Sequence, residues 1–343
     1  MKNRYIAFVS PGKAELLERE QALPEKGYVL VKTAVSTISS GTERANLIGD
    51  ANIRLDRDSA KAPVKFPRTV GYSSSGVVVA VGEGVESVKV GDRVAVSWGK
   101  HSEFQLLEEK NVHPLPENVS FEEAALAMIG TFPMAAIRKC HLEMGESAIV
   151  MGLGVLGLFA VQLLRAAGAY PVIAVDPVEE KRDEALSLGA DFAFDPFDPD
   201  FEEKVRSVSQ GGVKVAIEVT GNGKALDQVL DTMARFGRVA LLGCTRNSDF
   251  TIDYYRKVHG PGVSLIGAHT MARPNEESSA GLWTTKDDLR SILRLISGGR
   301  ISPAKLISKT HSPVLAPEVF GCLAVENHFP VVQFDWTLLG EEK

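Results

Sequence analysis

The second half of the chain alternates between short apolar runs and longer segments of helical periodicity. The apolar runs that we expect to be strands cover residues 148–151, 171–175, 191–194, 214–219, 238–243 and 263–267. Between the first two runs, apolar side chains recur at the spacing of one helix face, at Leu156, Ala160, Leu163, Leu164 and Ala167. Alternation of strands and helices over this length predicts an α/β fold with a parallel, doubly wound sheet.

Residues 1 to about 120 have a different pattern, in which short strands are separated by turns. Residues 28–35 are rich in β-branched side chains and alternate between two faces, as a strand does. Residues 76–81 are almost entirely apolar, and a Gly91-Asp92 break precedes the strand that we expect at residues 93–96. This pattern predicts a compact, β-rich domain.

The periodicity changes where the β-rich pattern ends. Ser120 is the expected N-cap of a helix, because Glu122 and Glu123 follow in the first turn, where the helix dipole favours acidic side chains. The end of the chain returns to a mixed pattern. Residues 287–296 predict an amphipathic helix, and residues 331–336 predict a final strand that rejoins the N-terminal β-rich domain.

A glycine-rich motif, Gly152-Leu-Gly-Val-Leu-Gly157, lies between the first strand and the first helix of the alternating half. Gly152 permits a tight turn, Gly154 allows the backbone to approach a pyrophosphate, and Gly157 allows the helix to pack closely on the strand. Asp176 follows at the end of the second strand, where a carboxylate can accept hydrogen bonds from an adenosine ribose. This order of elements predicts a dinucleotide site. The alternative is a glycine turn in another kind of βαβ unit.

Size and composition favour a soluble protein of two domains. The chain has 343 residues, which exceeds the usual size of one domain. A net charge of −6 gives no basis for expecting a nucleic acid or an anionic membrane as partner. No apolar run approaches the ~18 residues that span a bilayer, and the first residues contain no signal-like apolar segment. The cysteines are odd in number and far apart, so we expect free thiols and a cytoplasmic location; they are Cys140, Cys244 and Cys322.

Several motifs together resemble the medium-chain dehydrogenase/reductase family. Besides the glycine-rich motif, they are Gly41-Thr42, Gly71, Val81-Gly-Glu-Gly-Val85, Lys89-Val-Gly-Asp-Arg-Val94 and Asn111-Val-His-Pro-Leu-Pro116. The resemblance covers nearly the whole chain. It implies a GroES-like β-rich catalytic domain at residues 1–120 plus 285–343, and a doubly wound Rossmann domain at residues 121–284. It also implies an active site in the cleft between the domains, a small-molecule alcohol or carbonyl substrate, and a homodimer. Ser39-Ser-Gly-Thr-Glu43 and residues 124–138 are most similar to the branch that includes bacteriochlorophyllide dehydrogenase-like proteins.

The zinc-dependent branch of that family binds a catalytic metal through a cysteine, a histidine and a second cysteine or acid. The matching positions here are Ser40, Tyr72 and Ala127, and none of them supplies a thiolate, an imidazole or a carboxylate. The four-cysteine loop of a structural zinc site is also missing, since no cysteine precedes Cys140. We therefore predict no bound zinc. The alternative is an unfamiliar metal site built from Glu43, His101 and His269.

The resemblance extends to the residues around the expected cofactor. Asp176 favours NAD(H), because a carboxylate repels the charge of about −2 on the 2′-phosphate of NADP(H). Lys181 and Arg182 follow about one helical turn later; we interpret them as a solvated helix face rather than as partners of a 2′-phosphate. The positions that the resemblance places around the cofactor are Thr131, Val155, Leu156, Gly243, Gly267 and His269.

Without zinc, other groups must stabilise and protonate the oxygen atom that gains charge during hydride transfer. Thr42 matches a family hydroxyl that hydrogen-bonds the substrate alcohol; the alternative is a hydroxyl that satisfies a backbone group at the end of a strand. The phenol of Tyr72 has an ordinary pKa of about 10 and suits proton donation, or else Tyr72 fills the volume that the metal site leaves. Ser40 is at most a polar lining residue. His101 is a candidate proton shuttle, with a structural histidine as the alternative.

Three functions are compatible with these residues. The first is an NAD(H)-dependent, zinc-independent interconversion of an alcohol and a carbonyl, with Thr42 as hydroxyl donor and Tyr72 as acid. The second is the reduction of quinones or enones, which Asp176 disfavours because relatives with that activity mostly use NADPH. The third is an NAD-binding protein without catalysis. The retained Thr42 and the intact cofactor motif argue against it.

Overall fold

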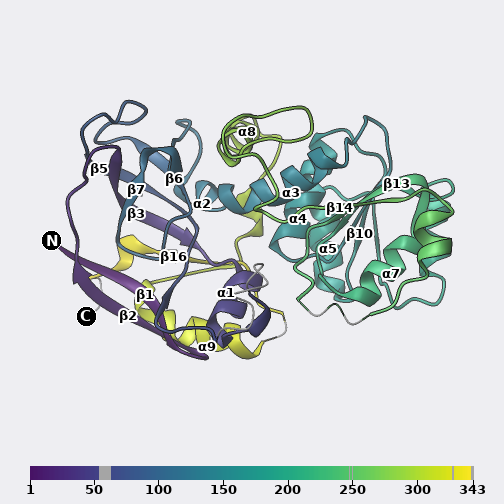
Figure 1. Cartoon of the computed structure of the whole chain (residues 1–343), viewed down its shortest axis with the longest axis horizontal. Helices are drawn as coiled ribbons and strands as arrows, with labels where there is room; N and C mark the ends of the chain where they lie inside the picture. The colour runs from purple at the N-terminus through teal and green to yellow at the C-terminus, as the bar shows by residue number, and fades with distance from the viewer. Residues whose placement is uncertain (54–62, 247, 249, 327, 341–343) are drawn as a thin grey trace. The chain divides into compact units, whose positions relative to one another are not determined.

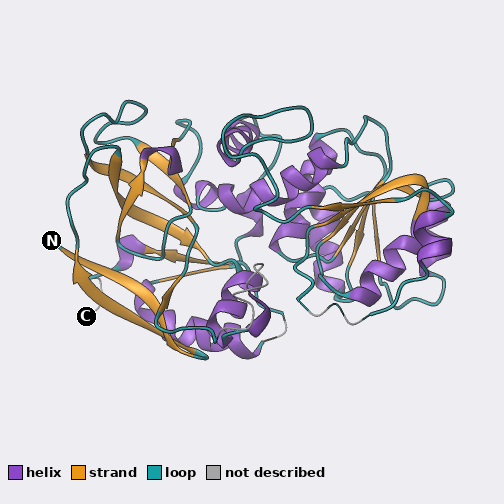
Figure 2. Ribbon diagram, in the orientation of Figure 1, coloured by secondary structure: helices purple, strands orange, loops and turns teal. Residues whose placement is uncertain are grey.

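The chain folds into two compact units, each with its own sheet (Figures 1 and 2). The computed structural model describes residues 1–53, 63–246, 248, 250–326 and 328–340. Unit 1 comprises Met1–Ile129, Leu289–Gly298 and Ser302–Lys343, and unit 2 comprises Gly130–Asp288 and Gly299–Ile301. Residues 121–129, which we expected in the Rossmann domain, therefore lie in unit 1.

Unit 1 is built on two sheets that are mostly antiparallel. A seven-stranded sheet has the order β15-β16-β3-β5-β6-β8, with β7 also paired to β3, and a three-stranded sheet has the order β2-β1-β4. This is the GroES-like, β-rich architecture that the resemblance implied. The strands are β1 (Lys2–Ser10), β2 (Lys13–Glu20), β3 (Tyr28–Thr37), β4 (Arg68–Thr69), β5 (Ser73–Val81), β6 (Arg93–Ser97), β7 (Phe104–Glu108), β8 (Val112–Pro114), β15 (Lys309–His311) and β16 (Val332–Asp335).

Strand β3 joins the beginning and the end of the chain. Its β-branched residues Val29 and Val31 are fully buried and pack with valines of β5 and β6. At its other end, β3 pairs antiparallel with β16, where Thr37 lies opposite Gln333. The amide of Gln333 donates a hydrogen bond of 3.0 Å to the Thr37 hydroxyl. The prediction of a final strand that rejoins the first domain is confirmed.

An apolar cluster fixes the position of helix α1 in unit 1. The rings of Phe8 and Phe320 meet edge to face, with 4.9 Å between their centroids. Phe334 from β16 and Leu47 from α1 belong to the same buried cluster, and all four side chains are fully buried. The packing therefore holds α1 against β1, β16 and helix α9.

Helix α2 begins as the sequence predicted. The Ser120 hydroxyl accepts a hydrogen bond from the backbone of Glu123, and the Glu123 carboxylate accepts one from the backbone of Ser120. The helix is short, because the chain turns at Ala125 and a second helix starts at Ala127. The Ser73 hydroxyl donates to the Ala125 carbonyl over 2.7 Å, which ties this turn to β5.

Unit 2 contains a parallel sheet with the strand order β11-β10-β9-β12-β13-β14. Helices lie on both faces of this sheet (Figure 2), so the fold is the predicted doubly wound Rossmann type. β13 begins at Met233, before the expected residue 238. Its pairing with β12 shifts register between Val213 and Val215, as at a β-bulge. The strands are β9 (Ala148–Met151), β10 (Val172–Val175), β11 (Phe192–Phe194), β12 (Val213–Glu218), β13 (Met233–Leu241) and β14 (Ser264–Gly267).

The helices follow the apolar periodicity of the sequence. In α4, every residue from Gly157 to Leu164 is buried, so this helix is covered on all sides. Among the described residues, no helix combines the length and the apolar character needed to cross a membrane. The helices are α1 (Ser40–Ile48), α2 (Phe121–Ala124), α3 (Ala127–Lys139), α4 (Val155–Ala166), α5 (Glu179–Ser187), α6 (Phe201–Val208), α7 (Gly223–Thr232), α8 (Thr285–Ser297) and α9 (Ala316–Val325).

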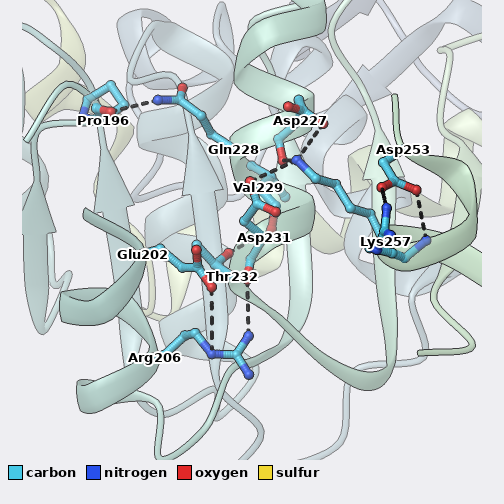
Figure 3. Close-up of polar contacts among 11 residues, drawn as sticks. Pro196, Glu202, Arg206, Asp227, Gln228, Val229, Asp231, Thr232, Asp253 and Lys257 are labelled. Carbon is cyan, nitrogen blue, oxygen red and sulfur yellow. Dashed lines mark hydrogen bonds and ion pairs between the residues drawn. The ribbon is translucent and has the colours of Figure 1, made fainter. Parts of the chain in front are cut away.

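Polar contacts fix helix α7 at the outside of unit 2 (Figure 3). The ammonium group of Lys257 lies 2.6 Å from the carboxylate of Asp227 and 2.8 Å from that of Asp231, one turn later. Burial lowers the pKa of Lys257, but the two carboxylates outweigh this and raise it. Arg206 donates to the carbonyl of Asp231, and Gln228 donates to that of Pro196. These contacts hold α7, the helix that follows β12 and its loop.

Candidate functional site

The glycine-rich loop joins β9 to α4 in unit 2. Gly152 has a φ of 97°, a conformation that residues with a Cβ rarely adopt. A Cβ atom at residue 157 would lie 1.9 Å from the carbonyl oxygen of Gly152, so only glycine fits where the helix crosses the loop. Gly154 is the N-cap of α4 and offers no side-chain cap. The first backbone N–H groups of α4 therefore remain available to an anion.

Asp176 connects the second strand to this loop. Its side chain is buried, and its carboxylate accepts hydrogen bonds from the backbone N–H groups of Leu153, at 2.9 Å, and Val178, at 3.0 Å. The carboxylate is thus held at the carboxyl end of the sheet, beside the glycine-rich loop. This is the place where a ribose hydroxyl would meet it in a Rossmann fold.

Two cationic side chains fold back toward Asp176. The Lys181 ammonium lies 3.9 Å from the Asp176 carboxylate, and the Arg182 guanidinium donates to the backbone carbonyls of Asp176 and Pro177 at 2.8 and 3.0 Å. Only 27% of the Lys181 side chain and 18% of the Arg182 side chain are exposed. The interpretation of these residues as a solvated helix face is wrong, because both contact the loop after β10.

Glu218 is a residue of this site that the sequence analysis missed. It ends β12, lies opposite Met151 of β9 and is buried. Its carboxylate accepts hydrogen bonds from the backbone of Thr220, at 2.7 Å, and of Gly221, at 3.1 Å, and from the Thr220 hydroxyl. Thr220 in turn packs on Gly152, since a Cβ at residue 152 would come within 2.8 Å of its methyl group. The available signal was a carboxylate at the end of an apolar run, with one residue between it and a Thr-Gly-Asn turn.

The remaining positions that the resemblance places around the cofactor lie at or near the ends of unit 2 elements, except for Thr131, which lies inside α3. Thr131 is fully buried in α3, and its carbonyl accepts a hydrogen bond of 3.1 Å from Arg273. Gly243 follows β13, and its N–H donates to the Glu218 carbonyl. Gly267 ends β14, where its carbonyl accepts from Lys139 at 2.8 Å. The first two residues of α4 are half-buried; they are Val155 and Leu156.

His269 lies two residues beyond β14 and is half-buried. Its Nδ1 atom accepts a hydrogen bond of 3.1 Å from the Met271 backbone. Burial lowers the pKa of His269, and the charges of Arg246 and Lys139 lower it further. The ring is therefore neutral at pH 7 and carries its proton on Nε2.

In unit 1, the candidate hydroxyl groups cluster at the N-terminus of α1. Ser40 is the first residue of this helix and Thr42 the third, and both are half-buried. The Thr42 carbonyl accepts a hydrogen bond of 2.8 Å from Asn46. The N-cap, Ser39, does not cap its own helix through its side chain. Its hydroxyl oxygen instead accepts a hydrogen bond from the phenol of Tyr72.

Tyr72 lies just before β5 and is half-buried. Its carbonyl accepts a hydrogen bond of 2.9 Å from the backbone of Trp98, and the two rings are 6.0 Å apart. The indole of Trp98 is 39% exposed. The Trp98 ring therefore lies beside the Tyr72 ring, and the phenol oxygen of Tyr72 is directed to Ser39.

His101 is fully buried. Its Nδ1 atom lies 2.8 Å from the Ser36 hydroxyl, and its Nε2 atom lies 3.0 Å from the Glu43 carboxylate. Glu43 and His101 are thus brought together, whereas His269, the third member of the alternative metal site, belongs to unit 2. The ring has no exposed surface through which a substrate could reach it.

Comparison with known proteins identifies the family. The family model described as "Alcohol dehydrogenase GroES-like domain" matches residues 25–137, and the one described as "Zinc-binding dehydrogenase" matches residues 155–283. L-threonine 3-dehydrogenase of Pyrococcus furiosus is 31% identical over 325 residues, which cover 86% of this chain and 87% of that protein. The chain belongs to the zinc-type medium-chain alcohol dehydrogenase family. It is therefore an oxidoreductase.

Solved structures share the fold of this oxidoreductase over almost its full length. The crystal structure of 2R,3R-butanediol dehydrogenase from Bacillus subtilis has a TM-score of 0.80 at 25% identity and covers 97% of this chain and 99% of that one. An alcohol dehydrogenase from Escherichia coli CFT073, solved with NADH, has a TM-score of 0.79 at 21% identity and covers 98% of this chain and 99% of that one.

The residues that the resemblance matches to the catalytic zinc ligands do not fit a zinc ion. Ser40 and Tyr72 offer hydroxyl groups, and Ala127, which is fully buried in α3, offers no ligand atom. Zinc sites use thiolate, imidazole and carboxylate ligands, and hydroxyl groups bind the ion poorly at neutral pH. In the described part of the chain, no three histidine, cysteine, aspartate or glutamate side chains are grouped closely enough to share a metal ion.

Glu218 leads to a prediction about stability and pH. Burial raises the pKa of its carboxyl group, although the hydrogen bonds from Thr220 and Gly221 oppose the shift. The folded protein keeps this proton at pH values where the unfolded chain has lost it. The stabilisation is therefore present below the ordinary pKa of 4.5 and is lost as the pH rises through the folded-state pKa.

We expect the variant Glu218→Gln to gain melting temperature relative to the wild type as the pH is raised from about 5 to about 8. The glutamine can still accept the hydrogen bonds from residues 220 and 221 but carries no charge. Differential scanning calorimetry of both proteins over this range measures the effect, with the exposed Glu180→Gln as control. A difference in melting temperature that stays constant with pH would contradict the assignment.

Proposed function

We propose that this oxidoreductase interconverts a small alcohol and its carbonyl compound with NAD(H) and without zinc. Relatives named as threonine and butanediol dehydrogenases support the alcohol–carbonyl reaction. The observation that carries the zinc-independent part is the phenol of Tyr72. The resemblance matches this residue to a metal-ligand position, and its hydroxyl is hydrogen-bonded to Ser39, the N-cap of α1 three residues before Thr42.

Residues of unit 2 would hold the cofactor. The open backbone N–H groups at the start of α4 suit its pyrophosphate, and the Asp176 carboxylate suits the hydroxyl groups of its adenosine ribose. A 2′-phosphate would meet the negative charge of Asp176, which supports NAD(H). When bound, a nicotinamide ring supplies the hydride acceptor or donor.

Hydroxyl groups of unit 1 replace the metal in this proposal. During reduction, negative charge develops on the substrate oxygen, and hydrogen bonds from Thr42 and Tyr72 stabilise it. For this the Tyr72 phenol turns its proton from Ser39 to the substrate oxygen and accepts a hydrogen bond from the Ser39 hydroxyl instead. The proton of the Tyr72 phenol moves to that oxygen, so that the alcohol forms, and the phenolate regains a proton through solvent. During oxidation the phenolate accepts the proton of the alcohol. Ser40 lines the site, and His101 does not contact the substrate because it is fully buried.

Three further assignments belong to the same proposal. The similarity of residues 39–43 and 124–138 supports a place near the bacteriochlorophyllide dehydrogenase-like branch, without a tetrapyrrole substrate. The free cysteines Cys140, Cys244 and Cys322 support a cytoplasmic location. The homodimer is an expectation from the family, and sedimentation analysis tests it.

Metal removal tests the central proposal. Protein treated with a strong chelator and checked by elemental analysis should turn over alcohol and carbonyl substrates at a rate within about twofold of the untreated enzyme, since no step needs a Lewis acid. Added zinc should leave the rate unchanged. A complete loss of activity that zinc restores would overturn the proposal. Turnover of quinones or enones alone would favour the second reaction over the first.

Removal of the hydroxyl groups should slow the chemical step. We expect Tyr72→Phe and Thr42→Val each to lower kcat by about 10²- to 10³-fold, because each loses a donor to the developing charge. Thr42→Ser keeps the hydroxyl and should retain most of the rate. Equilibrium titration should give the same Kd for NADH in all variants. Tyr170→Phe, at an exposed position of unit 2, is the matched control; a Tyr72→Phe enzyme as active as this control would refute the role.

Asp176 should determine the cofactor preference. In Asp176→Asn, the charge that repels a 2′-phosphate is gone, while Lys181 and Arg182 remain beside the site. We expect the ratio of kcat/KM for NAD to kcat/KM for NADP to fall by at least about tenfold, or about 1.4 kcal/mol. Steady-state kinetics with both cofactors measures this ratio, with the exposed Asp183→Asn as control. A wild-type enzyme that prefers NADP would already contradict the assignment.

A further inference from the structure

A continuous line of hydrogen bonds crosses the interior of unit 1. The Trp336 indole donates to the Ser36 hydroxyl over 2.8 Å, and this hydroxyl lies 2.8 Å from Nδ1 of His101. Nε2 of His101 lies 3.0 Å from the Glu43 carboxylate, whose other oxygen accepts the backbone N–H of Ser39 over 3.1 Å. The line begins directly after β16 and ends at the first turn of α1.

Water does not reach this line. Ser36 and His101 have no exposed surface, Glu43 is 1% exposed and Trp336 is 3% exposed. A buried polar group that loses its partner costs about 1–3 kcal/mol. Each member of the line therefore depends on its neighbours, and the line has a single favourable arrangement.

The hydrogen-bond count assigns the proton positions. The Ser36 oxygen accepts from Trp336, so its own proton goes to the acceptor that faces it, Nδ1 of His101. His101 then carries its proton on Nε2 and donates it to Glu43. The Glu43 carboxylate accepts two N–H groups, one from the Ser39 backbone and one from the His101 ring. Its place in the first turn of α1 adds the favourable field of the helix dipole.

His101 also contacts the segment between β4 and β5 that carries Tyr72. Its backbone N–H donates to the Val70 carbonyl over 2.7 Å. Gly71 packs directly against it: a Cβ atom at residue 71 would lie 2.4 Å from the His101 nitrogen and 2.6 Å from the ring. The same imidazole is thus packed against the segment before Tyr72 and hydrogen-bonded to the helix that carries Thr42.

We propose that Glu43 and His101 are positioning residues that fix the distance and orientation between the hydroxyl groups of Thr42 and Tyr72. Glu43 fixes the N-terminal turn of α1 through the Ser39 N–H, and the Ser39 hydroxyl holds the phenol of Tyr72. His101 fixes Glu43 on one side and the Gly71–Tyr72 backbone on the other. Neither residue touches the substrate. The expected effect on kcat rests on the proposed function, whereas the hydrogen-bonded arrangement of Glu43, His101 and Tyr72 does not.

The sharpest variant is Glu43→Gln, which keeps the volume and one oxygen. Its amide oxygen can still accept from Ser39, but its NH₂ group faces Nε2 of His101. The imidazole must then move its proton to Nδ1, and the Ser36 hydroxyl loses its acceptor. The matched control is His113→Gln. His113 is also a buried histidine of unit 1 bonded to a serine, with Nε2 at 3.1 Å from the Ser97 hydroxyl, and it has no part in this line.

Nuclear magnetic resonance tests the proton position on His101 and the environment of Tyr72 without an activity assay. With ¹⁵N-labelled histidine, His101 of the wild type should be neutral with its proton on Nε2, and Glu43→Gln should move the proton to Nδ1. With tyrosine labelled with ¹³C at Cζ, the Tyr72 resonance, assigned through Tyr72→Phe, should shift in Glu43→Gln and stay in His113→Gln. An imidazolium at His101, or a Tyr72 resonance that does not respond in folded Glu43→Gln, would overturn the inference.

The kcat of the variants is the second test. A misplacement of about 1 Å can cost about 10²-fold in rate, so we expect Glu43→Gln to lower kcat by about 10- to 100-fold. The Kd for NADH should stay within about twofold, because the cofactor residues lie in unit 2. A folded Glu43→Gln enzyme with the kcat of His113→Gln would overturn the inference. If zinc proves necessary for turnover, the proposed function fails, while the magnetic resonance result still decides the arrangement of Glu43, His101 and Tyr72.

Discussion

The hydrogen bonds of the Glu43 carboxylate join two segments in the polar interior of unit 1. A carboxylate away from water needs a donor for each oxygen, and here the donors are the Ser39 backbone and the His101 ring. These two donors belong to separate segments, the start of α1 and the loop before β7. The requirement to satisfy one carboxylate therefore sets the position of both segments. Thr42 is part of α1, and the segment that carries Tyr72 is hydrogen-bonded to His101 through the Val70 carbonyl.

Unit 2 uses buried carboxylates in a similar way. Asp176 and Glu218 each end a parallel strand, and each accepts backbone N–H groups from the loop that follows. Asp176 also reaches back to Leu153 in the glycine-rich loop. These two carboxylates thus hold the loops at the carboxyl edge of the sheet. In the sequence, each is recognisable only as an acidic residue at the end of a predicted strand. The contact between Gly157 and Gly152 then fixes the helix over this edge.

The sequence predicted most of the fold because its signals are local. The glycine motif, the alternation of strands and helices and the Ser120 cap each depend on neighbouring residues. The pairing of Glu43 with His101 joins positions 58 residues apart, and no periodicity reports such a contact. The sequence offered His101 both as a shuttle and as a structural residue, and only its burial separates the two. Lys181 and Arg182 turn back to the loop after β10 rather than into solvent, and helical spacing does not report the direction in which a long side chain turns.

The pairing of β16 with β3 affects the order in which the molecule can assemble during translation. β16 and Trp336 follow unit 2 in the chain, whereas their partners Thr37 and Ser36 precede it. All strands of the parallel sheet leave the ribosome before residue 332 does, so unit 2 can fold while the seven-stranded sheet still lacks a member. The nascent chain must keep the first 120 or so residues free of wrong partners for the whole of that time. Ser36 receives its indole donor only after all of unit 2 has been synthesised.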